Sequence, residues 1–233
     1  MNSILQDAFN CFHLDLTEDI CDKFDKYADL LIETNKKFNL TAITERDEVY
    51  EKHFGDSVSC AQFIDQGSRV IDVGCGAGFP GLPLKIARED LSVTLLDSLA
   101  KRVNFLSEVC SELKLKDVTP VHMRAEDAGA DEKFREKYDV SVARAVANLA
   151  VLAEYCLPFV KVGGVFLALK GRDADSELSD AEKAIEVLGG KCEKTEEVFW
   201  RGMEHRVIII RKVCKTPSKY PRKAGKPSKS PII

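Results

Sequence analysis

The sequence predicts an α/β fold: a doubly wound, mostly parallel seven-stranded sheet with an N-terminal helical cap. From Arg69 onward, short apolar runs typical of buried strands alternate with helical segments, which is the pattern of parallel strands joined by right-handed crossovers. Only a short turn at Gly202 separates the last two strand candidates, so we expect them to form an antiparallel hairpin at one edge. The 233 residues, 45% hydrophobic and 31% charged, suffice for one large globular core.

Residues 1–65 are predicted to form the helical cap. Thr17 is a suitable N-cap, and apolar residues follow it at helical spacing, which predicts an amphipathic helix ending near Asn35. Thr44 is expected to begin a second helix, which Gly55-Asp56-Ser57 should break. We expect both helices to pack on the main domain.

Residues 66–213 are predicted to form a Rossmann-like domain, and residues 214–233 a basic, Pro/Lys-rich C-terminal arm. Strands are expected at 69–73, 92–97, 118–123, 138–144, 164–170, 193–199 and 205–213, and helices near 81–89, 99–113, 149–157 and 174–188. The alternation of Pro with Lys or Arg in the arm favours an extended, polyproline-like segment.

The glycine-rich turn after the first strand is the strongest local motif. Glycines at such a turn let the backbone approach a nucleotide-like ligand, and with the following helix they place free backbone N–H groups beside it. Gly76-x-Gly78-x-x-Gly81 fits the dinucleotide fingerprint, whereas Asp72-x-Gly74-x-Gly76-x-Gly78 fits the turn of class I S-adenosylmethionine-dependent methyltransferases. The acid Asp72 suits a ligand with an ammonium group and would repel a pyrophosphate, and a terminal antiparallel strand also favours the methyltransferase interpretation. S-adenosylmethionine is therefore the expected cofactor; a tight turn without a ligand is the remaining alternative.

Four further charged residues lie at the ends of predicted strands or just after them, where ligands of such sheets bind. Asp97 is expected to accept hydrogen bonds from the ribose hydroxyls, or else to cap the following helix. Glu126 or a neighbouring amide is expected at the adenine edge, unless this turn is simply solvated. Arg144 needs an anion, which is a donor carboxylate, a substrate phosphate or a structural acid. Lys170 is a catalytic candidate or a solvated turn residue.

Charge is distributed unevenly along the chain. The formal net charge is −4, but all 38 Asp and Glu residues precede Arg211, and from there onward the chain holds eight Lys or Arg. This asymmetry predicts a basic arm that binds a polyanion, although a disordered solubilising tail has the same composition.

Other sequence features concern the cellular compartment. The eight cysteines show no C-x-x-C pair and no Cys/His ligand spacing, so we expect reduced thiols and no metal. The N-terminal residues lack a signal-peptide pattern, and no apolar run approaches the roughly 18 residues of a membrane span. We therefore expect a cytoplasmic protein without a membrane partner.

Missing motifs narrow the chemistry. No Pro-Pro-aromatic run follows the fourth strand, as exocyclic-amine methyltransferases require, and no Pro-Cys pair provides the nucleophile of carbon-5 pyrimidine enzymes. A magnesium-binding carboxylate cluster, which catechol-type enzymes use, is also missing. The methyl acceptor that these exclusions leave is an atom that is nucleophilic without help from a base. Guanine N7 is such an atom because its lone pair is free at neutral pH. Catalysis would then consist of orientation and desolvation.

Several segments together resemble the RsmG family, also called GidB. They are residues 72–84 (DVGCGAGFPGLPL), Ala125-Glu126, residues 143–147 (ARAVA) and the tail from Tyr220 to Pro231, with 39–41 and 53–57 similar to the family's N-terminal motifs. The resemblance covers about residues 36–231. It implies methylation of guanine N7 in the 530 loop of bacterial 16S rRNA, at the G527-type position.

The resemblance also implies site residues. Including the glycine-turn residues, the expected cofactor contacts are Asp72, Gly74, Gly76, Gly78, Phe79, Asp97, Ala125, Glu126 and Arg144. Arg144 would lie at the boundary between donor and substrate and, with Lys170, is a catalytic candidate. Cys75 stands where the family usually has Ala or Ser, but it is small enough for the turn. His53 is expected to be a half-buried helical residue, and a catalytic role for His53 or Asp56 stays open.

The expected partner is 16S rRNA or the small ribosomal subunit, bound by a monomer. The predicted RNA contacts are Asn39, Lys219, Tyr220, Arg222, Lys223, Lys226 and Lys229, with cations on phosphates and the tyrosine stacked on a base. Truncation after Arg211 should then weaken RNA binding and leave donor binding intact. A small-molecule methyltransferase, a non-catalytic ribosome-binding factor and a nicotinamide-dependent dehydrogenase remain as alternatives.

Overall fold

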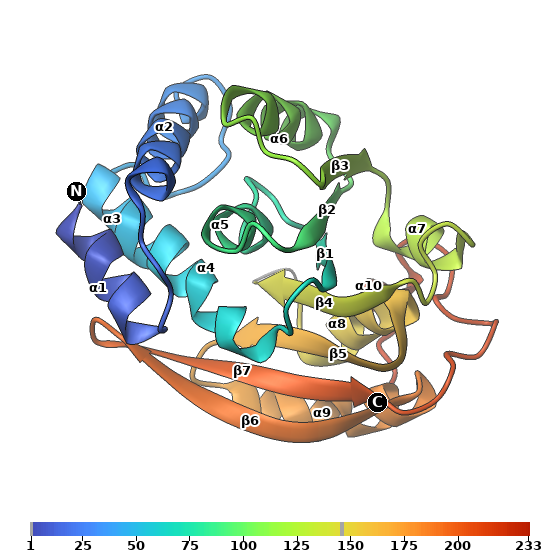
Figure 1. Cartoon of the computed structure of the whole chain (residues 1–233). Coiled ribbons are helices and arrows are strands. Elements are labelled where there is room, and N and C mark those ends of the chain that lie inside the picture. Colours follow the sequence, from blue (N-terminus) through green and yellow to red (C-terminus); the bar gives the residue numbers. More distant parts are fainter. Residues whose placement is uncertain (1, 145–146) are drawn as a thin grey trace.

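One seven-stranded sheet organises the molecule (Figure 1). The computed structural model describes residues 2–144 and 147–233. The strands are β1 (Arg69–Val73), β2 (Ser92–Asp97), β3 (Val118–His122), β4 (Tyr138–Arg144), β5 (Val160–Lys170), β6 (Gly190–Trp200) and β7 (Met203–Lys212). Their order is β3-β2-β1-β4-β5-β7-β6; β1 to β5 are parallel, and β7 is antiparallel to both of its neighbours. The predicted fold class is confirmed, with β7 paired to β5 so that β6 forms the edge.

Helices cover both faces of this sheet. They are α1 (Ser3–Cys11), α2 (Glu18–Asn35), α3 (Arg46–Glu48), α4 (Asp56–Val58), α5 (Gly81–Ala87), α6 (Ala100–Glu112), α7 (Ala125–Ala130), α8 (Leu149–Cys156), α9 (Ala174–Val187) and α10 (Lys226–Lys229). A π-helical turn (Val49–Gly55) joins α3 to α4, and 3-10 turns follow α4 (Ser59–Phe63) and α8 (Leu157–Phe159). Among the described residues, none of these helices combines the length and the apolarity needed to cross a bilayer.

A hydrophobic core lies on each face of the sheet. In β7, Val207 and Ile209 belong to one core and Ile208 and Ile210 to the other, because successive side chains of a strand point to opposite faces. The first core lies between the sheet and α1, α2, α5 and α6, and the second lies beneath α8 and α9 (Figure 1). The N-terminal cap thus shares one core with the helices of the main domain.

The N-terminal helices differ from prediction in two respects. Helix α1 was not expected, although its signal is present in the sequence: the Asn2 side chain accepts hydrogen bonds from the amides of Ile4 and Leu5, as an N-cap does. The expected break at residues 55–57 is wrong, because helical backbone continues from Arg46 to Phe63.

Gly55 has a packing role in place of the predicted helix-breaking one. A Cβ atom at Gly55 would lie 2.6 Å from the indole of Trp200, so only glycine lets the β6 tryptophan approach the helical backbone. The Trp200 indole N–H donates to the carbonyl of Glu51 at 2.9 Å. This contact joins the cap to the far edge of the sheet.

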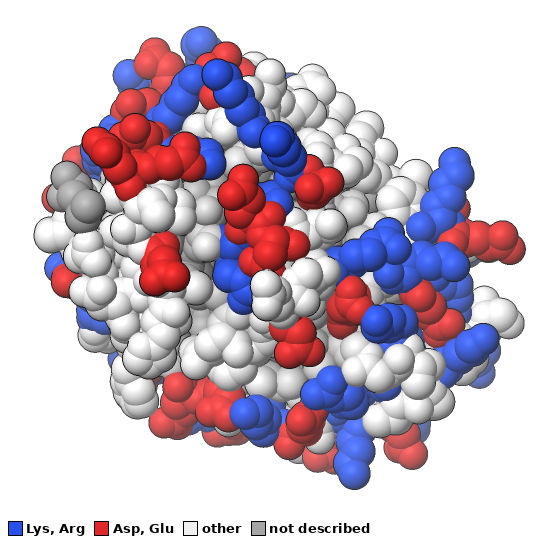
Figure 2. Space-filling model, viewed as in Figure 1, with Lys and Arg blue, Asp and Glu red and all other residues white. Residues whose placement is uncertain are grey.

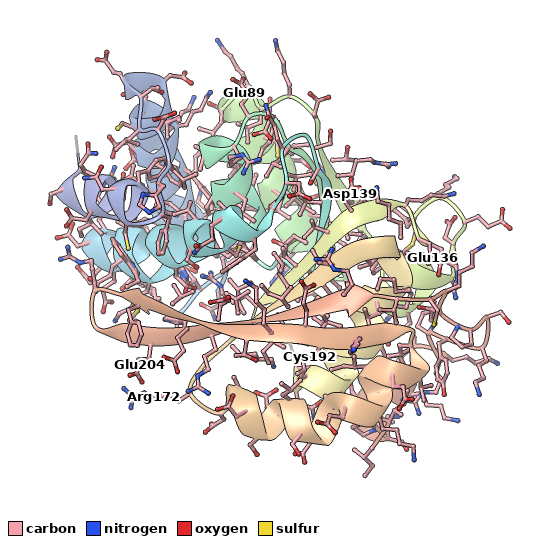
Figure 3. All side chains as sticks on the ribbon, turned by 60° about the horizontal axis from the view of Figure 1, so that its bottom comes forward. Glu89, Glu136, Asp139, Arg172, Cys192 and Glu204 are labelled. Carbon is pink, nitrogen blue, oxygen red and sulfur yellow. The ribbon has the colours of Figure 1, made fainter. Side chains whose placement is uncertain are left out.

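The prediction of an extended, polyproline-like C-terminal arm is also wrong. Residues 214–233 pack on the molecule and contain α10, and Thr216 is buried. Glu136 lies just before β4 (Figure 3), and its carboxylate accepts a hydrogen bond from the Thr216 amide at 3.0 Å. Arg135 donates to the carbonyls of Thr216 at 2.7 Å and Tyr220 at 2.8 Å. These partners, distant in sequence, override the local preference for an extended chain.

Candidate active site

The glycine loop, residues 74–79, connects β1 to α5. Five of its six backbone amides already have acceptors in the protein: Gly74 and Cys75 donate to the Leu96 carbonyl, Gly76 to the Asp97 carboxylate, and Gly78 and Phe79 to the Cys75 carbonyl. The expectation of free amides facing the ligand is therefore corrected. A loop with occupied amides and an adjacent carboxylate offers few donors to a pyrophosphate, which argues against a dinucleotide ligand.

The N-terminal cap supports this loop from behind. The Tyr27 hydroxyl donates to the Ala77 carbonyl at 2.5 Å, and its ring stacks on Phe54 and Phe79. A Cβ at Gly78 would lie 2.6 Å from the Tyr27 hydroxyl, and the φ of Gly78 is +109°, which L side chains rarely adopt. Gly78, which is predicted to contact the cofactor, is buried and has the cap side chain Tyr27 where its own Cβ would lie.

Asp72 lies beneath the loop, outside the cavity lining. Its Oδ2 accepts a hydrogen bond from the Gly81 amide at 2.7 Å, and its Oδ1 has no partner among the described residues. The side chain is fully buried. The predicted direct contact of Asp72 with the cofactor is thus replaced by a role in holding the start of α5 against β1.

A cavity of about 1030 Å³ opens at the carboxyl ends of the central strands. It is lined from the cap by Leu40, Thr41, Lys52, His53 and Asp56, from the glycine loop by Gly74, Cys75, Gly76, Ala77 and Phe79, and from the sheet side by residues that include Asp97, Arg144, Lys170 and His205. A smaller cavity of about 180 Å³ shares Gly74, Asp97 and Ser98 with it and extends past Ala125 and Glu126. The predicted strand-end residues therefore line two adjoining cavities.

Asp97 lies where the two cavities meet. Its carboxylate accepts from the amides of Gly76 at 2.9 Å and Leu99 at 2.8 Å. These bonds fix its orientation, and each carboxylate oxygen can accept more than one hydrogen bond, so Asp97 can still accept from a bound hydroxyl. The alternative of a helix N-cap does not hold, because α6 begins without a side-chain cap.

Arg144 connects three parts of the larger cavity. Its guanidinium forms an ion pair with Asp56, lies 5.1 Å from the centre of the Phe79 ring, and approaches the His53 Nδ1 at 3.3 Å. The His53 ring in turn stacks on Phe79 at 4.3 Å. The anion that Arg144 needed is thus a structural acid from the cap, and Ala145 and Val146, which follow it in the quoted motif, lie outside the described residues.

His205 was missed by sequence reasoning. Its Nδ1 lies 3.4 Å from Asp56, so the β7 strand brings a second imidazole to the Arg144–Asp56 pair. Nothing in the local sequence of β7 marks this residue, since only the strand order places β7 beside β5. The Thr41 hydroxyl, 2.7 Å from His53 Nε2, is the other unexpected polar neighbour.

Lys170 is buried and paired, so the alternative of a solvated turn residue is wrong. Its ammonium donates to the Ala147 carbonyl at 2.6 Å and to Glu177 at 2.7 Å. Glu177 also accepts from the Leu149 amide. Lys170 therefore ties the end of β5 to the starts of α8 and α9.

The predicted RNA-contact residues differ in exposure. Asn39, Lys219, Lys223, Lys226 and Lys229 are exposed, whereas Tyr220 is half-buried against the second core. The Arg222 guanidinium binds both oxygens of Glu154, which is 1% exposed. Arg222, which is predicted to contact RNA, uses its guanidinium in this internal ion pair.

The fully buried Asp72 and the half-buried His53 should make the stability of the protein depend on pH in opposite senses. Burial raises the pKa of Asp72 to about 7, so the folded protein holds a proton that the unfolded chain releases near pH 3.8. The stabilising contribution of Asp72 is complete at low pH and is lost as the pH rises toward 7. Burial and the Arg144 charge lower the pKa of His53 from 6.5 to about 3, so its contribution is lost as the pH falls below about 6.5.

We expect two variants to separate these effects. Each group changes the free energy of unfolding by at most about 1.4 kcal/mol per pH unit. Relative to the unmodified chain, Asp72→Asn should become more stable as the pH rises from about 4 to 7, and His53→Gln should become more stable as the pH falls from about 6.5 to 4. Urea unfolding across this range measures both. Parallel profiles for all three proteins would contradict the assignment.

Comparisons with known proteins extend over the whole chain. The model of the GidB family, described as rRNA small subunit methyltransferase G, matches residues 20–205. The ribosomal RNA small subunit methyltransferase G of Alkaliphilus oremlandii is 52% identical over 236 residues, which cover 100% of this chain and 99% of that protein. The protein of the same name from Acetivibrio thermocellus is 51% identical over 235 residues, covering 100% and 97%.

Solved structures share the fold at low sequence identity. M. jannaschii TYW2 in complex with AdoMet superposes with a TM-score of 0.55 at 16% identity, covering 69% of this chain and 76% of that chain. TrmN from Thermus thermophilus gives a TM-score of 0.52 at 18% identity, covering 70% of this chain and 53% of that chain.

Across residues 2–144 and 147–233 no group of three or more His, Cys, Asp or Glu is arranged to hold a metal, and the eight cysteines are free.

Proposed function

The chain belongs to the GidB family of rRNA small subunit methyltransferases G, and from this premise we propose that it methylates guanine N7 in the 530 loop of 16S rRNA, at the G527-type position. S-adenosylmethionine is the methyl donor. The observation that carries the proposal is the pair of adjoining cavities, which share Gly74 of the glycine loop and Asp97, with Arg144 lining the larger one. Residues 1–65, 66–213 and 214–233 are proposed as its cap, catalytic domain and basic segment.

The residues of these cavities fit a nucleoside that carries an amino-acid extension and no phosphate groups. Open space lies over Gly76, where a Cβ would meet no atom within 4 Å, so the backbone can lie against a ligand. The Asp97 carboxylate would accept hydrogen bonds from the ribose hydroxyls, and the adenine would bind in the smaller cavity beside Ala125. Gly74, Phe79 and Arg144 would flank the methionine part. The donor supplies an electrophilic methyl group on a sulfonium.

Guanine N7 needs no base, and the described residues offer no strong, free one beside Phe79. His53 is a weak base because its pKa is lowered to about 3, and Asp56 is occupied by Arg144. The protein would act by orienting the guanine and excluding water. Arg144 would hold the cap against the cavity at the boundary between donor and substrate. Lys170 would act as a positioning residue through Ala147 and Glu177.

The proposed RNA-binding surface lies beside the smaller cavity. Figure 2 shows Lys and Arg side chains gathered on the right of the molecule, where α7 and the C-terminal segment lie, with acidic side chains among them. The exposed lysines at 219, 223, 226 and 229 would contact phosphates. The salt slope of RNA binding, which is the slope of the logarithm of the binding constant against the logarithm of the salt concentration, should therefore be about −3. Asn39, in the exposed loop before Thr41, is proposed as a contact from the cap. We propose a cytoplasmic monomer acting on the RNA or on the small subunit.

Mapping the modified nucleotide tests this function. Purified protein is incubated with radiolabelled S-adenosylmethionine and either deproteinised 16S rRNA or small subunits. Label should appear at one guanine, and borohydride reduction followed by aniline cleavage should cut the RNA there, as expected for N7-methylguanosine. Donor binding without label in either RNA substrate would contradict the proposal and favour a small-molecule methyltransferase or a non-catalytic binding factor.

A further inference from the structure

We propose that the C-terminal segment, residues 214–233, forms one wall of the adenine subsite and thereby couples donor binding to RNA binding. This inference rests on the proposed function, since it takes the smaller cavity as the place of the adenine. It reverses the expectation that truncation after Arg211 leaves donor binding intact.

The smaller cavity has two sides of different origin. One side comes from the ends of β1, β2 and β3, and the other includes Tyr155 of α8 together with Gly225 and Ser228 of the C-terminal segment. The Gly225 amide donates to Glu126 Oε1 at 2.8 Å, and the hydroxyls of Tyr155 and Ser228 lie 2.8 Å apart. The segment therefore closes the cavity through bonds to residues that themselves line it.

An internal ion pair holds the segment in this place. The Arg222 guanidinium donates to both carboxylate oxygens of Glu154, and the Arg222 amide donates to the same group at 2.7 Å. Charge-assisted, bidentate bonds of this kind are strong and geometrically specific. Pro221 packs on α7, since a Cβ at Gly129 would lie 3.1 Å from its ring, and Pro227 is buried. These contacts anchor the segment beside the cavity.

The same short stretch carries the exposed lysines. Lys223, Lys226 and Lys229 surround Gly225 and Ser228 in sequence and are all exposed to solvent. A phosphate backbone bound by these lysines would fix the residues that line the adenine cavity, and a bound adenine would fix the lysines. Because binding free energies are reciprocal, each ligand should increase the affinity for the other.

A truncation after Lys223 tests the wall while keeping the Arg222–Glu154 pair. Calorimetry with adenosine and with S-adenosylhomocysteine should show Kd values about tenfold higher for both ligands, because each loses the same wall around its adenine. The double variant Lys226→Ala/Lys229→Ala is the matched control. It keeps the wall, so both Kd values should stay unchanged, while the salt slope of 16S rRNA binding should decrease in magnitude by about 1.4.

A point variant avoids any effect of truncation on folding. Ser228→Leu places a larger side chain at the cavity and should weaken adenosine binding about tenfold, whereas Ser230→Leu, at an exposed residue outside the lining, should not. In the full chain, S-adenosylhomocysteine should slow hydrogen exchange of the amides from Gly225 to Lys229.

The coupling has its own readout. A 16S rRNA fragment should lower the Kd of S-adenosylhomocysteine about fivefold in the full chain and not in the truncated one. Equal adenosine binding by the truncated, Ser228→Leu and unmodified chains would overturn the wall, and an RNA-independent Kd would overturn the coupling. If the unmodified chain bound neither adenosine nor S-adenosylhomocysteine, the proposed function itself would fail.

Discussion

Replacing Arg144 by alanine is expected to reduce methyl transfer to 16S rRNA by roughly 100-fold, the loss typical of misplaced reacting groups. The guanidinium joins Asp56 of the cap to Phe79 of the glycine loop and touches His53. Without it, three walls of the larger cavity lose their common contact. Single-turnover transfer at saturating donor measures the effect without contributions from product release.

Folding must be separated from activity in this experiment. Removing one partner of a buried ion pair costs about 3–5 kcal/mol, and Asp56 is 3% exposed. The double variant Arg144→Ala/Asp56→Asn removes the stranded charge, so it should recover most of the stability and none of the activity. Arg46→Ala, which breaks an exposed ion pair with Asp25 and Asp29, is the matched control and should leave transfer unchanged. Transfer by the double variant near the unmodified rate would exclude Arg144 from the site.

The positions of the site residues along the chain were predictable because they depend on local patterns. An apolar run followed by Asp72 and glycines marks β1 and its loop, and Asp97, Ala125 and Arg144 follow the ends of other strands. In a parallel sheet all such ends meet at one edge, so the strand pattern alone brings these residues together. The convergence on these two adjoining cavities follows from the topology.

The partners of those residues were not predictable, because they come from distant parts of the chain. A lone Arg144 after a buried strand required an anion, but nothing in the sequence identified Asp56, 88 residues away. In the same way the basic tail was interpreted from its composition, while Glu154 and Glu136 determine where it lies. The sequence predicts a cofactor contact for Asp72, but the side chain lies beneath the loop. Its depth is set by the packing of Gly81 against it, which the sequence pattern does not reveal.

Replacing Asp97 by asparagine is expected to weaken donor binding by roughly 100-fold, or about 2.8 kcal/mol. The carboxylate uses separate oxygens for the amides of Gly76 and Leu99, so an asparagine can satisfy only one of them and turns its NH₂ group toward the other. Its charge-assisted bonds to the ribose hydroxyls would also become weaker bonds to a neutral amide, a loss of about 1 kcal/mol each. Calorimetry with S-adenosylhomocysteine measures the sum.

Deoxynucleosides separate the ribose contact from the support of the loop. In the unmodified chain, 2′-deoxyadenosine and 3′-deoxyadenosine should bind more weakly than adenosine, since each leaves Asp97 one hydroxyl short. In Asp97→Asn this difference should become smaller, because a neutral amide with one acceptor oxygen binds the two hydroxyls more weakly than the carboxylate does. If the deoxy analogues instead lost the same factor in both proteins, Asp97 would act only through Gly76 and Leu99. Ribose recognition would then have to come from another residue at the junction of the two cavities, where Ser98 lies next to it.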